Sequence, residues 1–199
     1  MKKFSVIFLA LFISACSVSV PPVTEYGLKI DTKQTKILKK KCLKSLKVQQ
    51  GFAPDDLTTT KMYYAQEKYK LYTYSQSAWV EAPNRSISDA LVEKIRNYGV
   101  FSSVSSYRSR AASDLILEIN IDDFKQYFNA NETKSFAKLS ITLNLLDRKK
   151  SQIIASKTIV KELKVKTLDA QGGVRALNTL LNQFLDESVV WLEKVCNDK

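Results

Sequence analysis

The sequence contains no histidine, the side chain on which most nucleophilic and metal-dependent sites rely. Its absence excludes Ser-His-Asp and Cys-His catalytic sites and histidine-ligated metals. Glycine is scarce as well, with five in 199 residues, and none forms the GxGxxG or Walker pattern that holds phosphates. Of the acidic pairs, Asp55-Asp56 is typical of a turn, and the neighbours Asp122-Asp123 would point to opposite faces of a strand. The sequence therefore predicts a protein that is not an enzyme and has no metal or cofactor.

Long apolar runs are also missing, apart from the ten residues Phe4–Ile13. That length is half of the roughly 20 residues that cross a bilayer, and the basic segment Met1–Lys3 before it is typical of an export signal. The following Ile13–Cys16 (Ile-Ser-Ala-Cys) is similar to the lipobox of bacterial lipoproteins. We expect residues 1–15 to be a signal peptide and Cys16 to carry lipid. An ordinary signal peptide with a chance cysteine is the alternative.

Acylation at Cys16 would hold the mature chain on a membrane, because two or more acyl chains anchor stably where one does not. Ser17 follows Cys16, whereas lipoproteins kept in the inner membrane often carry Asp there, so we expect the periplasmic face of the outer membrane. Residues 16–22 would form the lipidated cysteine and a tether of about 20 Å at full extension. Residues 23–199 would form one domain in the periplasm. Because nucleic acid is not found in that compartment, we expect no nucleic acid partner.

Basic residues outnumber acidic ones by 31 to 20, and seven lysines gather between Lys33 and Lys47. Such a patch suits anionic lipid headgroups or an acidic partner, although a solvated strand flank would have the same composition. Two further cysteines, Cys42 and Cys196, form an even pair for an oxidising compartment. A disulfide and two buried free thiols are both compatible with this sequence.

The hydrophobic pattern predicts strands, a helix, more strands and a final helix. Alternation of apolar and polar residues predicts half-buried strands, and apolar residues at three- and four-residue steps predict helices. The expected strands are 24–30, 43–48, 61–66, 69–74, 115–122, 139–145 and 153–160, and the expected helices are 87–98 and 174–195. This order predicts an α+β two-layer sandwich, in which two helices pack on one face of an antiparallel sheet.

Aromatic residues are concentrated between positions 63 and 79. Tyr72, Tyr74 and Trp79 are candidates for a contact surface, because tyrosine and tryptophan combine an apolar ring with a polar group. If Leu71 points into the core, alternation places Tyr72 and Tyr74 outside. Burial of these rings in the core is the equally weighted alternative.

The ordered motifs of the chain resemble a known family. They are Tyr72–Pro83 (YTYSQSAWVEAP), Gly99–Val104 (GVFSSV), Asp114–Ile119 (DLILEI) and Asp123-Phe124. With the lipobox, they are similar to the ABC-type transport auxiliary lipoproteins, the paraquat-inducible protein C-like group. The lysine-rich segment 33–41 and the two additional cysteines depart from that pattern, so the resemblance leaves open whether an N-terminal contact surface is shared.

The resemblance implies a role in transport between the two membranes. Its members work with an ABC ATPase, a permease and a mammalian-cell-entry (MCE) domain protein that moves lipids or other hydrophobic molecules. We therefore expect a non-catalytic docking component whose partners are the MCE protein, the ABC transporter complex and the bilayer around Cys16. A structural or assembly lipoprotein for an outer-membrane β-barrel is the alternative.

Overall fold

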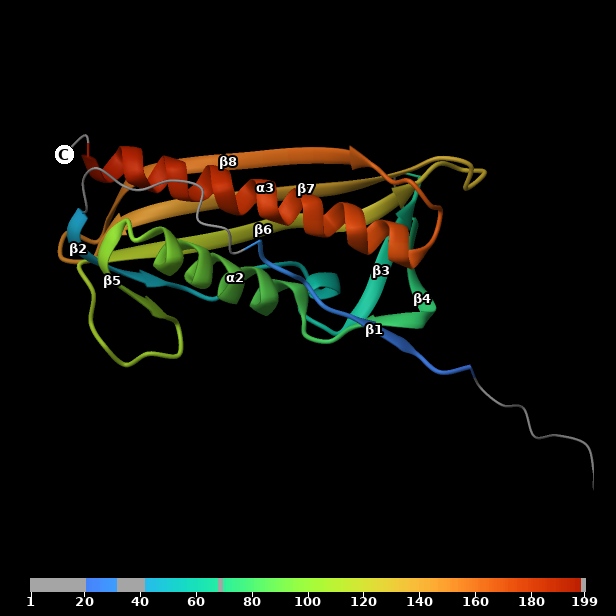
Figure 1. Cartoon of the computed structure of the whole chain (residues 1–199), viewed down its shortest axis with the longest axis horizontal. Coiled ribbons are helices and arrows are strands. Elements are labelled where there is room, and N and C mark those ends of the chain that lie inside the picture. The colour runs from blue at the N-terminus through green and yellow to red at the C-terminus, as the bar shows by residue number, and fades with distance from the viewer. Residues whose placement is uncertain (1–20, 32–41, 68–69, 198–199) are drawn as a thin grey trace, which may run out of the picture.

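The computed structural model describes residues 21–31, 42–67 and 70–197 (Figure 1). Within them, eight strands, one short 3-10 helix and two α-helices follow one another. In chain order they are β1 (Thr24–Tyr26), β2 (Cys42–Val48), η1 (Asp55–Leu57), β3 (Lys61–Gln66), β4 (Lys70–Trp79), α2 (Pro83–Tyr98), β5 (Phe101–Ser106), β6 (Leu115–Phe128), β7 (Ser135–Asp147), β8 (Gln152–Lys164) and α3 (Ala170–Asn197).

The strands form one sheet that forks at β6. On one edge, β6 pairs antiparallel with β7, which pairs antiparallel with β8. On the other edge, β6 pairs in parallel with β2 at Leu115–Leu117 and with β3 at Gln126–Phe128. β5 continues the first branch, and β4 followed by β1 continues the second.

The sheet is therefore mixed, which corrects the expectation of a purely antiparallel one. Strands joined directly by a short turn pair antiparallel, as in β3–β4, β6–β7 and β7–β8. Parallel pairs form between strands that are separated by a crossover, for example β2 and β5, with α2 between them. Alternation within one strand reveals a buried face but carries no information about the strand beside it.

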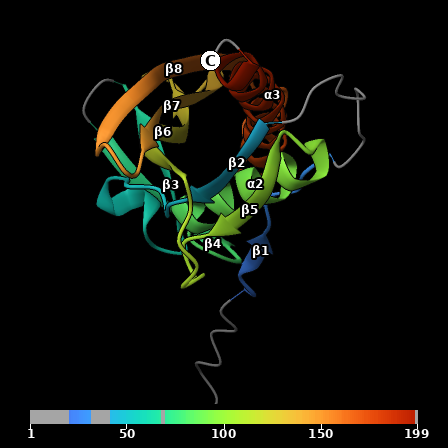
Figure 2. The ribbon, with the colours of Figure 1, turned by 90° about the vertical axis from the view of Figure 1, so that its left-hand side faces the viewer.

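Both helices pack on the same face of the sheet, and the end-on view shows the sheet curving beside them (Figure 2). α3 contacts β6, β7 and β8, while α2 contacts β5, β2 and β6. The core between the layers holds the inward residues of the strands together with Leu91, Ile95, Leu181 and Phe184, all essentially inaccessible to solvent. The α+β two-layer sandwich with two helices on one face is thus confirmed.

A bulge in β6 changes which residues face the helices. The pairing with β7 shifts between Ile121 and Asp123, so the inward series 115, 117, 119, 121 continues as 124, 126, 128. Asp122 accepts a hydrogen bond from Ser140, and Asp123 lies 3.8 Å from the Lys138 ammonium group. Ser140 and Lys138 both lie on the outer face of β7, so the bulge places both carboxylates there. The expectation that they point to opposite faces is wrong for this reason.

Candidate functional site

The described part of the chain offers no obvious centre for chemistry. Within residues 21–31, 42–67 and 70–197, no three histidine, cysteine, aspartate or glutamate side chains gather as metal ligands would. In the same ranges, neither α-helix combines the length and apolarity needed to cross a bilayer. The expected lipidation site, Cys16, lies outside the described residues. Two surfaces are candidates for binding, and they lie at the two ends of the long sheet.

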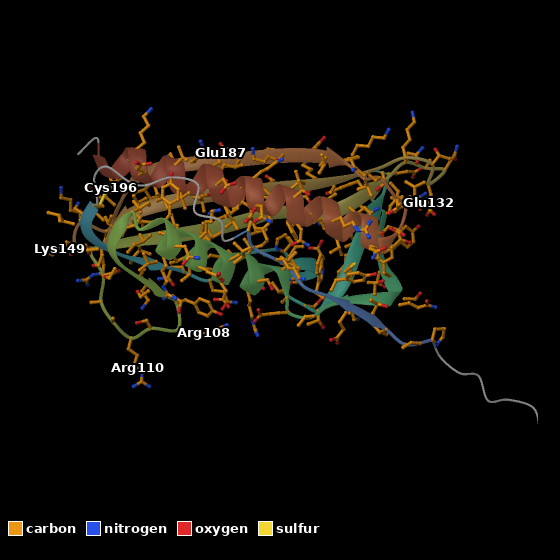
Figure 3. The ribbon with its side chains drawn as sticks, in the orientation of Figure 1. Arg108, Arg110, Glu132, Lys149, Glu187 and Cys196 are labelled. Carbon is orange, nitrogen blue, oxygen red and sulfur yellow. A yellow bond between two sulfur atoms is a disulfide. The ribbon has the colours of Figure 1, made fainter. Side chains whose placement is uncertain are left out.

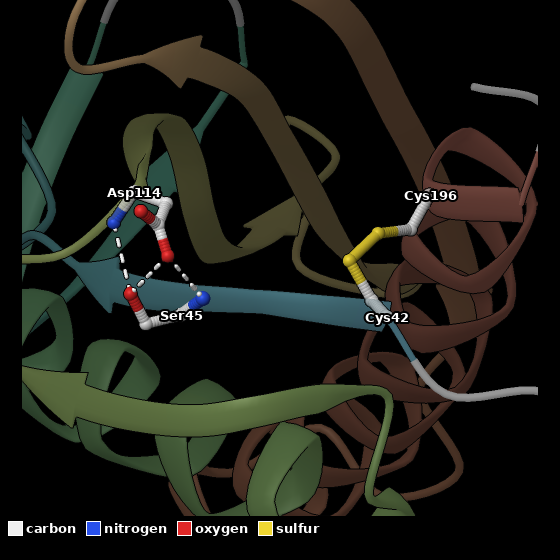
Figure 4. The surroundings of a disulfide bond; sticks show 4 residues. All are labelled: Cys42, Ser45, Asp114 and Cys196. Atoms are coloured by element: carbon white, nitrogen blue, oxygen red, sulfur yellow. Dashed lines mark hydrogen bonds between the residues drawn. A yellow bond between two sulfur atoms is a disulfide. The ribbon is translucent and has the colours of Figure 1, made fainter.

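One end, which we call the disulfide end, contains Cys42 at the start of β2 and Cys196 near the end of α3. The structure joins these two cysteines in a disulfide, with their Cα atoms 5.8 Å apart (Figure 4). The bond connects positions 154 residues apart, so it ties the start of β2 to the last turn of the final helix. Cys42 is buried and Cys196 is half-buried.

A compact polar contact lies beside the disulfide. The backbone N–H and the hydroxyl of Ser45 both donate to Asp114 Oδ2, at 2.9 and 2.7 Å, and the Asp114 N–H donates to Ser45 Oγ at 2.9 Å (Figure 4). The Ser45 backbone N–H, followed by its hydroxyl, holds the pKa of Asp114 below its ordinary value. This contact fixes β2 against the start of β6.

The surface of the disulfide end is basic and partly apolar. In the β7–β8 turn, Asp147 Oδ1 accepts the backbone N–H groups of Lys149 and Lys150, whose side chains are exposed (Figure 3). Leu43 is 92% exposed and Ile153 is 58% exposed. Of the lysine-rich segment, positions 33–41 lie outside the described residues, whereas Lys47 donates to the Ser109 carbonyl.

The opposite end, which we call the aromatic end, is built from the β3–β4 and β6–β7 hairpins. Tyr64 lies at its centre, with ring centroids 5.6 Å from Tyr72, 4.6 Å from Tyr74 and 5.4 Å from Phe128. Tyr74 is half-buried, and its hydroxyl donates to Gln126 Oε1 at 2.9 Å. Burial raises the pKa of Tyr74, so its hydroxyl keeps its proton. Tyr72 is 42% exposed and is the outermost ring of this group.

Trp79 does not belong to this surface, which corrects its assignment as a contact residue. It is only 4% exposed, and its ring lies 6.3 Å from the buried ring of Phe124. Trp79 comes five residues after Tyr74, so alternation alone would place the two side chains on opposite faces of the strand. Of the three candidates, Tyr72 is exposed, Tyr74 is half-buried and contacts Tyr64 as Tyr72 does, and Trp79 belongs to the core.

Two apolar side chains that the sequence did not single out, Leu71 and Phe136, are exposed on the outer face of the aromatic end. The strand register aligns Leu71, Ala65, Tyr127, Phe136 and Lys164 in one row across five strands. Phe136 stacks on Tyr127 with centroids 5.1 Å apart. Both rings line a hollow of about 470 Å³ whose rim includes Lys134 and Lys164. Phe136 stands at a polar position of an alternating strand, and that mismatch was the signal available in the sequence.

Next to this row, on the same outer face, lies a partly buried polar group formed by β6 and η1. Lys125 Nζ lies 2.5 Å from Asp56 Oδ2, and the Tyr127 hydroxyl donates to Asp123 Oδ2. Among the described residues, the buried Asp123 Oδ1 has no hydrogen-bond partner. Burial outweighs the Tyr127 hydroxyl and the nearby lysines, and it raises the pKa of Asp123 above its ordinary value.

The segment after β1 is held against α3 by two asparagines one helical turn apart. The strand expected over residues 24–30 ends at Tyr26, and the chain then runs along the helix. Asn178 Oδ1 accepts the Lys29 N–H at 2.7 Å, and Asn182 Oδ1 accepts the Asp31 N–H at 2.6 Å. Asn182 also donates to the Lys29 carbonyl at 3.0 Å. These side chains replace the backbone partners that a neighbouring strand would supply, and so they fix the N-terminal arm, residues 27–31.

Comparison with known proteins gives the fold and the family. A crystal structure of a Xanthomonas campestris protein, described as DUF330, superimposes with a TM-score of 0.77 at 18% identity, covering 88% of this chain and 98% of that one. A second crystal structure, of an uncharacterised protein, gives a TM-score of 0.67 at 16% identity, with 86% and 99% covered. Among curated proteins, none matches the sequence significantly.

The family model described as "ABC-type transport auxiliary lipoprotein component" matches residues 26–188, which include β3, β4, α2 and all three long strands. The match begins in β1 and ends within α3. It therefore includes the residues of the disulfide end and of the aromatic end, with the exception of Cys196. The resemblance inferred from the ordered motifs is confirmed, and the chain belongs to the ABC-type transport auxiliary lipoprotein family.

Proposed function

We propose that this protein is a non-catalytic docking component of an ABC-type transport system that moves lipids between the two membranes. It is held by acylated Cys16 at the periplasmic face of the outer membrane and contacts an MCE-domain protein there. The observation that carries the proposal is the family match over residues 26–188, joined to the Ile13–Cys16 segment that precedes it.

The arrangement of the two ends supports a docking role. The disulfide end presents Leu43 and Ile153 beside the exposed Lys44, Lys149 and Lys150. Protein interfaces combine exposed apolar side chains with charged ones, and the lysines favour an acidic partner. The disulfide and the Ser45–Asp114 contact hold this surface in one shape. We assign partner binding to this end, in place of the surface around Trp79.

The test is recovery of the partners from cells that express the protein with its anchor. Wild type is expected to yield an acylated N-terminal peptide, to fractionate with membranes, and to co-purify with an ATPase, a permease and an MCE-domain protein. Cys16→Ser is expected to lose acylation and membrane fractionation. The double variant Lys149→Glu/Lys150→Glu is expected to keep the anchor and lose most of the recovered MCE protein.

A matched control is the double variant Lys61→Glu/Lys166→Glu, which makes the same change of charge at two exposed lysines away from the disulfide end. It should recover the partners as wild type does. Unchanged recovery with the Lys149/Lys150 variant would reject the assigned surface. Recovery of an outer-membrane β-barrel with no transporter component would reject the transport role and favour an assembly role.

A further inference from the structure

We propose that the aromatic end rests on the phospholipid surface that holds the protein's own anchor, with Leu71, Tyr72 and Phe136 in the headgroup layer. The inference rests on the acylated Cys16 of the proposed function and adds an orientation to it. The domain then stands on the membrane with the disulfide end directed away from it. Three observations support this orientation: the direction of the chain before β1, its length, and the side chains at this end.

The register of β1 sets the direction in which the chain leaves the domain. β1 pairs in parallel with β4, with Thr24 opposite Ser77 and Tyr26 opposite Trp79. β4 begins at the β3–β4 hairpin and runs away from it. Followed backward from Thr24, the chain therefore runs toward the aromatic end, and Figure 1 shows residues 21–23 leaving on that side of the molecule.

The length of the tether keeps this end close to the membrane. Five residue steps separate Pro21 from Cys16, and they reach about 17 Å when fully extended. The fourteen residues of β6, which join the two ends, span about 46 Å. The tether is thus much shorter than the domain, and the end from which it leaves is the one it holds near the headgroups.

The side chains at this end suit the boundary between water and lipid. Large hydrophobic side chains exposed there are Val23 beside the tether, Leu71 and Tyr72 on β4, Phe136 on β7 and Leu168 in the loop before α3. Lys134 and Lys164 border the hollow lined by Tyr127 and Phe136. Aromatic rings concentrate at membrane interfaces, and lysines there extend their ammonium groups toward headgroups.

The exposed rings are supported rather than free. Tyr72 packs on Tyr64, which in turn contacts Tyr74 and the buried Phe128, and Phe136 stacks on Tyr127. The surface is therefore preformed, and little ordering is needed for it to settle on lipid. The disulfide end also exposes Leu43 and Ile153, but the length of β6 separates it from the tether.

The experiment places a photoreactive side chain at each end of the acylated, full-length protein. Tyr72→benzoylphenylalanine and Phe136→benzoylphenylalanine probe the aromatic end. Ile153→benzoylphenylalanine and Val160→benzoylphenylalanine are matched controls at exposed apolar positions of β8. Each protein is reconstituted in vesicles of phosphatidylethanolamine and phosphatidylglycerol and irradiated, and lipid adducts are measured by mass spectrometry. We expect several-fold more adduct at positions 72 and 136 than at 153 and 160.

A second variant tests the surface itself. Phe136→Glu, in the protein that carries the probe at position 72, should reduce the lipid adduct several-fold, whereas Val160→Glu should leave it unchanged. The orientation alone would be overturned if the acylated protein binds vesicles but its probes at 72 and 136 label no more lipid than the controls, or label a second copy of the protein instead. An unmodified Cys16 and loss of vesicle binding would overturn the anchor of the proposed function and the orientation with it.

Discussion

The two ends of the domain are held together in different ways. At the disulfide end, a covalent bond fixes β2 to the last helix, and a carboxylate that accepts two hydrogen bonds from Ser45 fixes β2 to the start of β6. At the aromatic end, ring contacts and the buried Gln126 join two hairpins, and Gln126 lies close to Gly173 at the start of α3. The stability of the disulfide end depends on the redox state of its compartment, while that of the aromatic end depends on how its side chains pack. Substitutions at the two ends should therefore fail in different ways.

Loss of the disulfide should produce the largest effect. A bond between positions 154 apart removes much of the freedom of the unfolded chain, for which chain-entropy models give about 5 kcal/mol, and native disulfides contribute roughly 2–5 kcal/mol. We expect Cys42→Ala/Cys196→Ala to lower the free energy of unfolding by about 2–5 kcal/mol. Urea unfolding of wild type with and without a reductant provides the comparison.

The control for this prediction is the double variant itself, whose stability should not respond to reductant. Thiol titration of the denatured, unreduced mature protein should find no reactive thiol at positions 42 and 196. Two free thiols, or equal stability of oxidised and reduced wild type, would show that the two cysteines do not pair.

The second prediction tests the packing of the aromatic end. A Cβ atom added at Gly173 would overlap Gln126 Oε1, the atom that accepts the Tyr74 hydroxyl. Gln126 is 2% exposed, and its amide nitrogen donates to Ser135 Oγ, so it has little room to move. Overpacking of this kind costs typically about 1–3 kcal/mol, and we expect Gly173→Ala to lower the free energy of unfolding by that amount.

Gly27→Ala is the matched control, since nothing lies within 4 Å of a Cβ built at that position. Its unfolding curve should coincide with that of wild type. The destabilisation by Gly173→Ala should persist in the reduced protein, because it acts at the opposite end from the disulfide. A wild-type unfolding curve for Gly173→Ala would mean that Gln126 is not confined as the structure indicates.

The third prediction concerns the arm that runs between the two ends along α3. Asn182→Ala removes the acceptor for the Asp31 N–H and the donor to the Lys29 carbonyl. A typical hydrogen bond contributes about 1 kcal/mol, so the arm should open more often while the rest of the domain stays folded. Hydrogen exchange of the Lys29 and Asp31 amides should accelerate about fivefold or more, and Gln183→Ala, an exposed neighbour, should leave it unchanged.

The fold was predictable where one strand or helix carries its own signal. The alternation in β6, β7 and β8 and the apolar spacing in α2 and α3 reflect burial against a single partner layer, and these elements lie where they were expected. Pairing partners were not predictable, because the fork at β6 depends on contacts between strands far apart in the sequence. The bulge at Asp122 was hidden as well, since two adjacent aspartates fit either strand phase.

The candidate surfaces were predictable only in part. Cys42 and Cys196 were recognised as a possible pair because only two cysteines remained, although spacing alone did not distinguish a bond from free thiols. Alternation placed Tyr72 outside only on the condition that Leu71 points into the core. The register instead puts Leu71 on the outer face and Tyr72 on the face of Gln126, and both prove exposed at the end of a hairpin. A strand that extends beyond the helical layer exposes both its faces, and the sequence does not reveal where that layer ends.

The smallest effect concerns the buried carboxyl group of Asp123, which accepts the hydroxyl of Tyr127. Because burial raises the pKa of Asp123 in the folded state above its unfolded value near 3.9, the folded state holds the proton more tightly. The stability associated with this group is therefore present at low pH and is lost as pH rises from about 4 through the folded pKa. Asp123→Asn removes the ionisation and keeps an acceptor for the Tyr127 hydroxyl.

We therefore expect the stability of Asp123→Asn relative to wild type to increase as pH rises through this window and to level off above it. Urea unfolding of both proteins over a pH series measures this difference. Asp114, Asp147 and Asp169 have lowered pKa values and act in the opposite direction, but they are common to both proteins and cancel. A stability difference that is independent of pH would show only the loss of contacts with Lys125 and Lys138. A difference that decreases as pH rises would mean that those lysines outweigh burial in setting the pKa of Asp123.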